Sequence, residues 1–369
     1  MLRWGILGTA QIARKNWKAI LNSGNGVVVA VASRNGERSR QFVEECQLQA
    51  PFEVPPRPLA TYQQLIAAPD VDAVYVPLPT GIRKEWVQRA AEAGKHVVCE
   101  KPCALTVADL KEMMETCNRN RVQFMDGVMF MHSARLPRMR AVLQDRVALG
   151  QLKRITSTFA FEVPDAFFAS NVRVQSDLEP HGCLGDLGWY CIRFALWVMD
   201  WQLPLRVSGK MLSEFKHSHS KAPVPTEFSG ELFFEGGVSS SFYCSFLTGI
   251  EQWVIVTGTH GHLHIRDFVL PFSGNELGFE VNKPNYQMRG SDFEMLPHTS
   301  ALGVKEHSHS HPSAQESNLF RNFADKVLSD KLDESWPDIA LKTQIVMQAC
   351  RESSVAQGRL VDIGTARLK

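Results

Sequence analysis

A short apolar run that ends in charge constrains this chain more than any other stretch: His96-Val97-Val98-Cys99 leads directly into Glu100-Lys101-Pro102. Such a run, opened by Gly94 and closed by a proline, predicts a strand that is buried on both faces, as in parallel sheets. In open α/β sheets, ligands bind just beyond the carboxyl ends of the strands. Lys101 therefore occupies a position suited to chemistry, although a lone lysine at a strand end more commonly faces solvent.

The first third of the chain alternates between short buried strands and helices. Apolar runs predict strands over 4–7, 27–32, 71–76, 96–99 and 122–125. The segments between them predict helices from residue 9 towards 21 and over 62–68, 84–93 and 108–117, whereas the Pro-rich stretch 51–58 predicts a loop. This alternation is typical of a doubly wound parallel sheet. We expect an α/β Rossmann domain over residues 1–126.

The pattern changes after residue 126. Segments rich in Thr, Phe and Val predict strands over 154–162, 205–212, 226–234, 237–247, 251–257 and 262–266, with hairpin breaks at 235–237 and 260–261. Helices are expected over 184–199, 315–329 and 337–357. A chain of 369 residues is long enough for two domains. The second, over 127–369, is therefore predicted to be α+β with a large, mostly antiparallel sheet.

The turn after the first strand resembles a dinucleotide fingerprint. In the pattern G-x-G-x-x-G/A, Gly8 fills the first position and Ala13 the third. Ala10 stands where a second glycine usually lets the backbone approach a pyrophosphate, so the phosphates would have to sit slightly further out. The motif is recognisable but weakened.

The end of the second strand points to the form of the cofactor. Enzymes that bind NAD usually place Asp or Glu here, against the ribose 2′-hydroxyl, whereas this chain has Ser33-Arg34, followed by Arg38. A hydroxyl and a guanidinium suit a 2′-phosphate. A solvated basic helix start is an equally good reading for Arg38, but less so for Arg34. NADP is the favoured cofactor.

Composition excludes several classes of protein. The net charge is +1 and provides no broad basic field for nucleic acid or an anionic membrane. No apolar run approaches the ~20 residues of a membrane span, and the N-terminus lacks the layout of a signal peptide. The eight cysteines form no CxxC pair, so we expect reduced, mostly buried thiols and a cytoplasmic location.

Two histidine clusters raise the question of a metal. His217 and His219 form one, and His307, His309 and His311 form the other. No Asp or Glu completes a compact ligand set at either, and both lie among Ser, Lys and Pro. We interpret them as solvated loop residues and expect no metal.

Three motifs in order along the chain resemble the glucose-fructose oxidoreductase / inositol dehydrogenase (Gfo/Idh/MocA) family. They are the turn 8–13, the strand end 100–102 and the run Gly182-Cys183-Leu184-Gly185-Asp186-Leu187-Gly188-Trp189-Tyr190. The resemblance covers essentially the whole chain. The segments 75–80, 125–127 and 243–246 are similar to the branch that contains NADP-dependent D-xylose dehydrogenases and dimeric dihydrodiol dehydrogenases.

The resemblance implies a set of site residues. It assigns catalysis to Lys101, Asp186 and Tyr190, and substrate binding to Phe130, His132, Asp186 and Tyr190. Cofactor binding falls to Gly8, Thr9, Ala10, Gln11, Ile12, Ser33, Arg34, Arg38, Pro77, Leu78, Pro79, Thr80, Glu100 and Lys101.

Two departures from the family pattern matter for the substrate pocket. Many relatives have histidine at the position of Arg83 and another at the position of Tyr190. Tyrosine at the second position resembles the xylose and dihydrodiol dehydrogenase branch, so this change supports the assignment. The arginine leaves the shape of the pocket open.

The implied activity is NADP-dependent hydride transfer to or from a sugar or a cyclic vicinal diol. If residues 184–199 are helical, Asp186 and Tyr190 lie one turn apart on one face. A tyrosine is a weak base at its ordinary pKa of about 10, and we expect the nearby Lys101 cation to lower the pKa of Tyr190. From pattern alone, Tyr190 could equally be a core tyrosine among Trp189 and Trp197.

Two alternative functions stay open at this stage. The first is a non-catalytic NADP-binding regulator, because the family includes a transcriptional co-repressor without catalysis. The second is an NAD-dependent glycosidase. Retention of Lys101 and Tyr190 argues against the first, and Ser33-Arg34 against the second. We also expect a homodimer formed through the outer face of the second sheet, carrying Phe242, Tyr243, Phe246 and Trp253.

Overall fold

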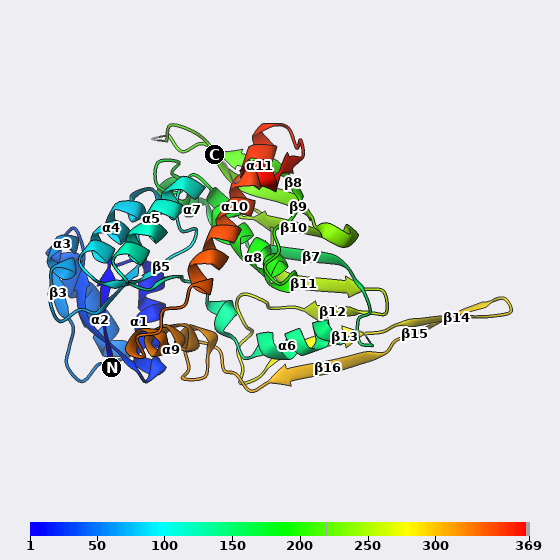
Figure 1. The fold of residues 1–369 in the computed structure, drawn as a ribbon, viewed down its shortest axis with the longest axis horizontal. Coiled ribbons are helices and arrows are strands. Elements are labelled where there is room, and N and C mark those ends of the chain that lie inside the picture. The colour runs from blue at the N-terminus through cyan, green and yellow to red at the C-terminus, as the bar shows by residue number, and fades with distance from the viewer. Residues whose placement is uncertain (146, 219, 367–369) are drawn as a thin grey trace.

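The first sheet is parallel throughout and has the strand order β3-β2-β1-β4-β5-β6. Its strands are β1 Leu2–Leu7, β2 Gly26–Ala32, β3 Arg57–Leu59, β4 Ala73–Val76, β5 His96–Cys99 and β6 Phe124–Asp126. This order is that of a dinucleotide-binding Rossmann sheet: β2 and β3 are added on one side of β1, and β4, β5 and β6 on the other. The computed structural model describes residues 1–145, 147–218 and 220–366 (Figure 1).

Helices cover both faces of this sheet (Figure 1). They are α1 Gln11–Ser23, α2 Gly36–Gln49, α3 Tyr62–Ile66, α4 Thr80–Glu92 and α5 Val107–Arg119. Local sequence sets their ends. Helix α1 ends at Gly24, whose φ of 80° is accessible to glycine at little cost. Helix α3 begins with a capping box in which Thr61 and Gln64 satisfy each other's backbone amides.

For this domain, the prediction of a buried strand over 71–76 is confirmed, whereas the prediction of a loop over 51–58 is partly wrong. Strand β4 is buried along its whole length, as expected for a parallel sheet covered on both faces. The Pro-rich loop over 51–58 was wrong at its end, because Pro58 lies in β3 and pairs with Val31. Proline is tolerated there because β3 is an edge strand, which needs donors on one side only.

The second sheet is mixed, and within the described residues its strand order is β16-β13-β12-β11-β7-β10-β9-β8-β17. Strands β7 and β10 pair in parallel, while the other strand pairs described in this sheet are antiparallel. The strands are β7 Leu152–Ala160, β8 Arg206–Phe215, β9 Val224–Phe233, β10 Ser239–Ser245, β11 Glu251–Gly258, β12 His262–Ile265, β13 Leu277–Asn282, β16 Thr299–Val304 and β17 Val361–Asp362. A Rossmann domain followed by an α+β domain is therefore confirmed.

Helices α8 and α10 pack on the inner face of the second sheet, between it and the first domain (Figure 1). The helices of this part are α6 Arg135–Gln144, α7 Asp165–Ser170, α8 Trp189–Val198, α9 Gln315–Leu328, α10 Ser335–Val355 and α11 Ile363–Ala366. Four shorter turns are η1 Met129–His132, η2 Val172–Val174, η3 Leu184–Gly188 and η4 Glu235–Gly237. The helix predicted over 184–199 therefore begins with a π-helical turn, η3, before α8.

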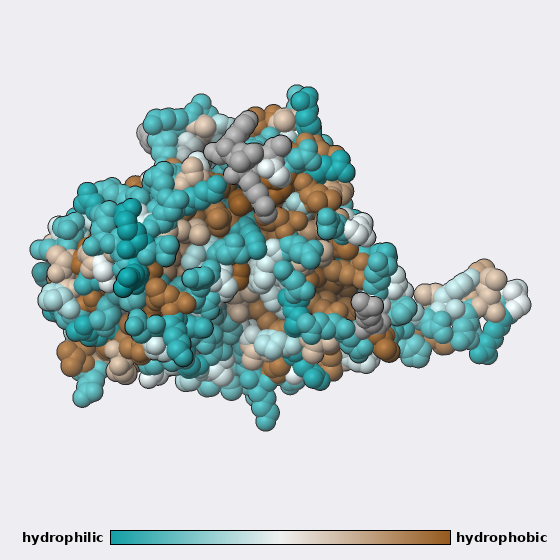
Figure 2. Space-filling model, in the orientation of Figure 1, coloured by the Kyte–Doolittle hydropathy of each residue, from teal (hydrophilic) through white to brown (hydrophobic). Residues whose placement is uncertain are grey.

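Sequence reasoning predicted no strand between 277 and 304. There the chain forms β13, β16 and a separate hairpin of β14 Asn285–Arg289 and β15 Asp292–Leu296. The hairpin projects from the rest of the molecule (Figure 1, Figure 2). Cross-strand partners share a face. Its apolar face is exposed: Tyr286, Met288, Phe293 and Met295 are 51–69% accessible.

The expected outer face of the second sheet needs a correction. Phe242 and Phe246 are buried, and the Phe242 ring lies next to Gly188 at the end of η3, so their assignment to the outer face was wrong. Tyr243 and Trp253 fall on the opposite, half-buried positions. The expected dimer stays a prediction.

One helix from the end of the chain packs on the first domain. Helix α9 lies against α1 (Figure 1), and the Arg321 Nε donates to the Ser23 carbonyl at 2.8 Å. The Trp4 ring on β1 meets Phe320 edge-on, with centroids 5.2 Å apart, and a tilted Phe323 at the same separation. The division at residue 126 stays a prediction, but residues 315–328 complete the core beneath β1.

Candidate active site

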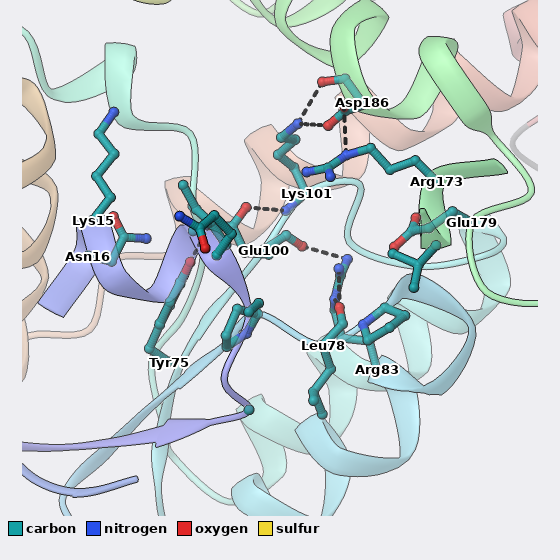
Figure 3. Close-up of a pocket in the computed structure, with 18 of the residues that line it drawn as sticks. Lys15, Asn16, Tyr75, Leu78, Arg83, Glu100, Lys101, Arg173, Glu179 and Asp186 are labelled. Carbon is teal, nitrogen blue, oxygen red and sulfur yellow. Dashed lines mark hydrogen bonds and ion pairs between the residues drawn. The ribbon is translucent and has the colours of Figure 1, made fainter. Parts of the chain in front are cut away.

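A cleft of about 1000 Å³ runs along the carboxyl ends of β1, β2, β4 and β5, where the second domain faces the first. This is the edge at which ligands bind in open α/β sheets. Most of the residues assigned from sequence line it: Gly8, Thr9, Ala10, Gln11, Ile12, Ser33, Arg34, Arg38, Pro77, Leu78, Pro79, Glu100, Lys101, Asp186 and Tyr190. Figure 3 shows the part of the cleft around Lys101.

The turn from β1 into α1 forms one end of the cleft. Gly8 has a φ of 115°, and a Cβ there would lie 3.1 Å from the Leu78 side chain, so both conformation and space favour glycine. Helix α1 begins at Gln11, directly after the turn. Its first backbone amides have no partner within the helix and attract anions. This end of the cleft is therefore suited to a pyrophosphate.

Two arginines stand beside this turn, at the end of β2. Arg34 and Arg38 are exposed, and in the described parts of the chain neither forms an ion pair with a carboxylate. Burial raises the pKa of the Tyr62 hydroxyl, and the two arginines partly oppose that rise, which places them near it. Ser33 is buried beside them. Because no described carboxylate pairs with them, these guanidinium groups leave donors for an additional phosphate.

Buried hydrogen bonds hold the end of β5 in place. The Tyr75 hydroxyl donates to Glu100 Oε1 at 2.6 Å, and the Lys101 amide donates to Glu100 Oε2 at 3.2 Å. Arg83 is 2% exposed and donates to the carbonyls of Leu78, Glu100 and Pro102. Arginine at this position therefore holds the backbone of the turns around Lys101.

Lys101, Asp186 and Tyr190 lie together, although they are far apart in sequence. The Lys101 ammonium donates to the Asp186 carboxylate at 2.7 Å and to its carbonyl at 2.6 Å. The same ammonium lies 4.6 Å from the centroid of the Tyr190 ring. The η3 turn and the start of α8 present Asp186 and Tyr190 on the side facing β5.

Arg173, which sequence reasoning missed, completes this group (Figure 3). Its Nε lies 2.9 Å from Asp186 Oδ2, so one carboxylate is shared by two cations. Burial alone would raise the pKa of Asp186, but Arg173 and Lys101 outweigh it and lower the pKa to about 2. Asp186 is therefore ionised at any physiological pH.

Lys101 lowers the pKa of Tyr190 as expected, but burial outweighs it, so the net shift is upward. Tyr190 is 7% exposed, and burial raises its pKa to about 12, while Lys101 opposes this only in part. Glu100 and Asp186 raise the pKa further. The tyrosine is consequently protonated at neutral pH and can donate a hydrogen bond or a proton.

Three residues assigned from sequence do not line the cleft. Thr80 is buried and donates to the Glu179 carboxylate, through its amide at 2.9 Å and its hydroxyl at 2.6 Å. Phe130 packs behind Tyr190, with ring centroids 6.2 Å apart. His132 lines a second cavity of about 440 Å³, bonded to Asn322 at 3.0 Å, and burial lowers its pKa to about 4.

The histidine clusters have ordinary protein partners where the structure describes them. His217 hydrogen-bonds to the Ala169 carbonyl and His309 to Ser273, whereas His219 lies outside the described residues. His307 and His311 stack, with centroids 3.8 Å apart. Across the described residues, no group of three or more His, Cys, Asp or Glu side chains could hold a metal ion. Within the same residues no helix is long and apolar enough to span a membrane.

Two family models match the chain. Residues 2–128 match the GFO_IDH_MocA oxidoreductase family with an NAD-binding Rossmann fold, and residues 138–264 match the GFO/IDH/MocA C-terminal domain. A 3-ketoreductase from Actinomadura kijaniata, solved with NADP and TDP-benzene, superposes with a TM-score of 0.78 at 23% identity, covering 95% of this chain and 97% of that one. At this identity the superposition establishes the fold alone.

Three curated proteins are similar in sequence. D-xylose 1-dehydrogenase (NADP(+)) 2 from Haloferax volcanii is 29% identical, over 71% of this chain and 75% of its own length. A dTDP-3,4-didehydro-2,6-dideoxy-alpha-D-glucose 3-reductase from Streptomyces violaceoruber is 31% identical, over 80% of each chain. Trans-1,2-dihydrobenzene-1,2-diol dehydrogenase from Sus scrofa is 28% identical, over 82% of this chain and 85% of its own.

Proposed function

This chain belongs to the GFO/IDH/MocA oxidoreductase family, and we propose that it is an NADP-dependent dehydrogenase or reductase that interconverts a hydroxyl and a carbonyl group on a sugar or a cyclic vicinal diol. One observation carries the proposal. The Lys101 ammonium, bonded to Asp186 and lying over the Tyr190 ring, stands at the carboxyl edge of β5 with Tyr190 protonated beside it. This arrangement suits proton transfer to or from a substrate oxygen.

The residues present fit a nicotinamide dinucleotide phosphate. Gly8 leaves space where a Cβ would contact Leu78, and the start of α1 offers free amides to the pyrophosphate. Arg34 and Arg38 offer guanidinium donors for a 2′-phosphate, with Ser33 beside them. Beyond them the cleft continues to Glu100 and Lys101, which would border the nicotinamide.

When bound, the nicotinamide supplies or accepts the hydride, so the chain itself has to manage the proton. In the direction of reduction, Tyr190 donates its proton to the substrate oxygen, which becomes a hydroxyl group. Lys101 donates a hydrogen bond to the same oxygen and favours the tyrosinate that remains. Asp186 holds the Lys101 ammonium in place through two hydrogen bonds. In the direction of oxidation, the same groups act in reverse.

The names of the relatives support the substrate class. Those reported above are a D-xylose dehydrogenase, a 3-reductase of a nucleotide-linked deoxysugar and a dehydrogenase of a cyclic diol. Each name describes oxidation or reduction at a carbon of a polyhydroxylated or cyclic compound. We place this chain in the same substrate class and leave its preferred compound to experiment.

A substrate screen with both forms of the cofactor tests the proposal. The protein is incubated with NADP and a panel of aldoses, polyols and cyclic diols, or with NADPH and the matching carbonyl compounds, and the absorbance of reduced nicotinamide is followed. We expect turnover of at least one sugar or diol by the intact protein, and its loss in Tyr190→Phe. Cofactor binding without any turnover would instead support the non-catalytic regulator.

A further inference from the structure

We propose that Arg173 is a specificity residue that selects substrates carrying a carboxylate or phosphate group at the substrate end of the cleft, an inference that rests on the proposed function. Arg173 belongs to η2, on the segment that borders the cleft from the second domain. It lies outside the three sequence motifs at 8–13, 100–102 and 182–190. Figure 3 shows its guanidinium reaching from that segment to Asp186, on the same side of the cleft as Lys101.

The exposure of Arg173 differs from that of its neighbours. Its side chain is 42% accessible, whereas those of Lys101 and Asp186 are 9% and 14% accessible. Partial exposure spares the guanidinium the desolvation cost of complete burial and keeps its outer edge accessible. Part of this charge therefore remains open to the cleft.

Most of the side-chain donors of Arg173 have no partner among the described residues. A guanidinium has five N–H donors in a planar fork, and Arg173 pairs with Asp186 through Nε. Among the residues that the structure describes, Asp186 is the one carboxylate that forms an ion pair with it. The terminal amino groups are therefore available as a pair, and a carboxylate or phosphate matches their geometry.

The hydrogen-bond partners of the nearby carboxylates leave the terminal amino groups of Arg173 unengaged. Asp186 already has Lys101 as a counter-ion at 2.7 Å, so Arg173 is a second cation on one carboxylate. Two further carboxylates, Glu179 and Glu100, act on Arg173 at longer range and raise its pKa, after the larger effect of Asp186. Both oxygens of Glu179 accept from Thr80, and those of Glu100 accept from Tyr75 and the Lys101 amide. Neither glutamate forms an ion pair with Arg173 in the described residues, so its terminal amino groups remain available to the substrate.

Matched pairs of sugars test the inference. With NADP, kcat and KM are measured for D-glucose against D-glucuronate and D-glucose 6-phosphate, for D-galactose against D-galacturonate, and for D-xylose against D-xylose 5-phosphate. We expect the anionic member of at least one pair to have a kcat/KM roughly ten- to a hundred-fold higher, mainly through KM, because a charge-assisted pair is being made. Preference for a uronate or for a sugar phosphate identifies which oxyanion is bound.

Variants separate this role from support of Asp186. Arg173→Met should remove the preference by raising KM for the anionic sugar much more than KM for its neutral partner, and Arg173→Lys should restore part of it. The control is Lys221→Met, which removes a cation that is 86% exposed and outside the cleft. It should leave the preference intact.

The outcomes for the two proposals can be told apart. Turnover that favours the neutral sugar in every pair, or a preference that survives in Arg173→Met, overturns the inference and leaves the proposed function standing. If Arg173→Met lowers kcat equally for both members of a pair, Arg173 acts by supporting Asp186, and the inference is also overturned. Failure to turn over any sugar or diol with NADP or NADPH overturns the proposed function and this inference with it.

Discussion

Lys101 and Tyr190 should behave as one proton-transfer unit, and a double-mutant cycle can establish this. Tyr190→Phe removes the proton donor but keeps the ring that contacts Phe159 and Phe130. We expect the chemical step to slow by roughly 10²–10⁴-fold, the range typical of a lost general acid or base. At about 1.4 kcal/mol for each factor of ten, this raises the barrier by roughly 3–5 kcal/mol.

Lys101→Met should cost a similar factor for a reason visible in the structure. The substitution removes the cation that bonds Asp186 twice and that opposes the rise in the pKa of Tyr190 caused by burial. Asp186 then keeps only the half-exposed Arg173 as a counter-ion. The double variant should be less than tenfold slower than the slower single variant, because groups that act as a unit give strongly non-additive effects.

Single-turnover mixing of the NADPH-loaded protein with its best carbonyl substrate measures the chemical step directly. The rate of reduction should stay level through neutral pH and fall as the pH approaches the Tyr190 pKa of about 12, because Tyr190 has to be protonated to donate. The rate of oxidation should rise with pH over the same range. NADPH fluorescence should report unchanged cofactor affinity in Tyr190→Phe, whose side chain faces the substrate.

Near-normal turnover by Tyr190→Phe would remove this residue from the mechanism. Fully multiplicative losses in the double variant would mean that Lys101 and Tyr190 act independently. If the rate of reduction already declines at pH values well under 9, the raised pKa of Tyr190 is contradicted.

The remaining predictions concern the cofactor, acid stability, domain contact and assembly. Arg34→Ala should weaken NADP binding by roughly ten- to a hundred-fold and NAD binding little, measured by fluorescence titration; equal affinity of the intact protein for both would contradict this. Burial lowers the pKa of His181 to about 4, from an unfolded value near 6.5. The free energy of unfolding should therefore fall by about 2 kcal/mol through this group between pH 7 and pH 5, because the unfolded chain binds the proton first. Urea unfolding of His181→Asn should show a smaller fall over the same pH range. Gly81→Ala would place a Cβ 2.3 Å from the Asp177 carbonyl and should cost about 1–3 kcal/mol in thermal unfolding, while Gly249→Ala, which meets nothing within 4 Å, should be neutral. Light scattering at micromolar concentration should give the mass of a dimer, because the apolar face of the β14–β15 hairpin is exposed in the monomer, and a monomeric mass would exclude it.

The parts of the fold that the sequence predicted are those in which local pattern and tertiary environment agree. The buried run at 96–99 and the turn at Gly8 carry their own signals, namely continuous apolarity and a glycine before a helix. The strands between 277 and 304 carry little: β14, β15 and β16 are largely exposed, so alternation between buried and exposed positions is weak. Strand β3 was missed because proline in a strand is rare away from an edge, and edge position is a tertiary property.

The same distinction holds for the site: residues within motifs could be identified from sequence, and residues outside them could not. Lys101 and Asp186 were identified because they belong to motifs, and the structure brings them within 2.7 Å. Arg173 lies in an irregular segment with no motif, and only tertiary contact places it against Asp186. The sign of the Tyr190 pKa shift could not be obtained from sequence, because it depends on the balance between burial and one nearby cation. Sequence pattern can therefore identify candidate site residues, but their pKa values depend on burial, which only the structure shows.

The packing of α9 against α1 affects how this chain folds during synthesis. Domains of a long chain generally fold as units while the ribosome is still extending them, the N-terminal one first. Here the ring of Trp4 is covered by Phe320 and Phe323, which are made some three hundred residues later. A nascent chain that has passed residue 126 should therefore hold its parallel sheet with one aromatic surface uncovered. Until α9 emerges, that surface is open to chaperones and to other nascent chains, so the yield of native protein should depend on how quickly the last third of the chain is translated.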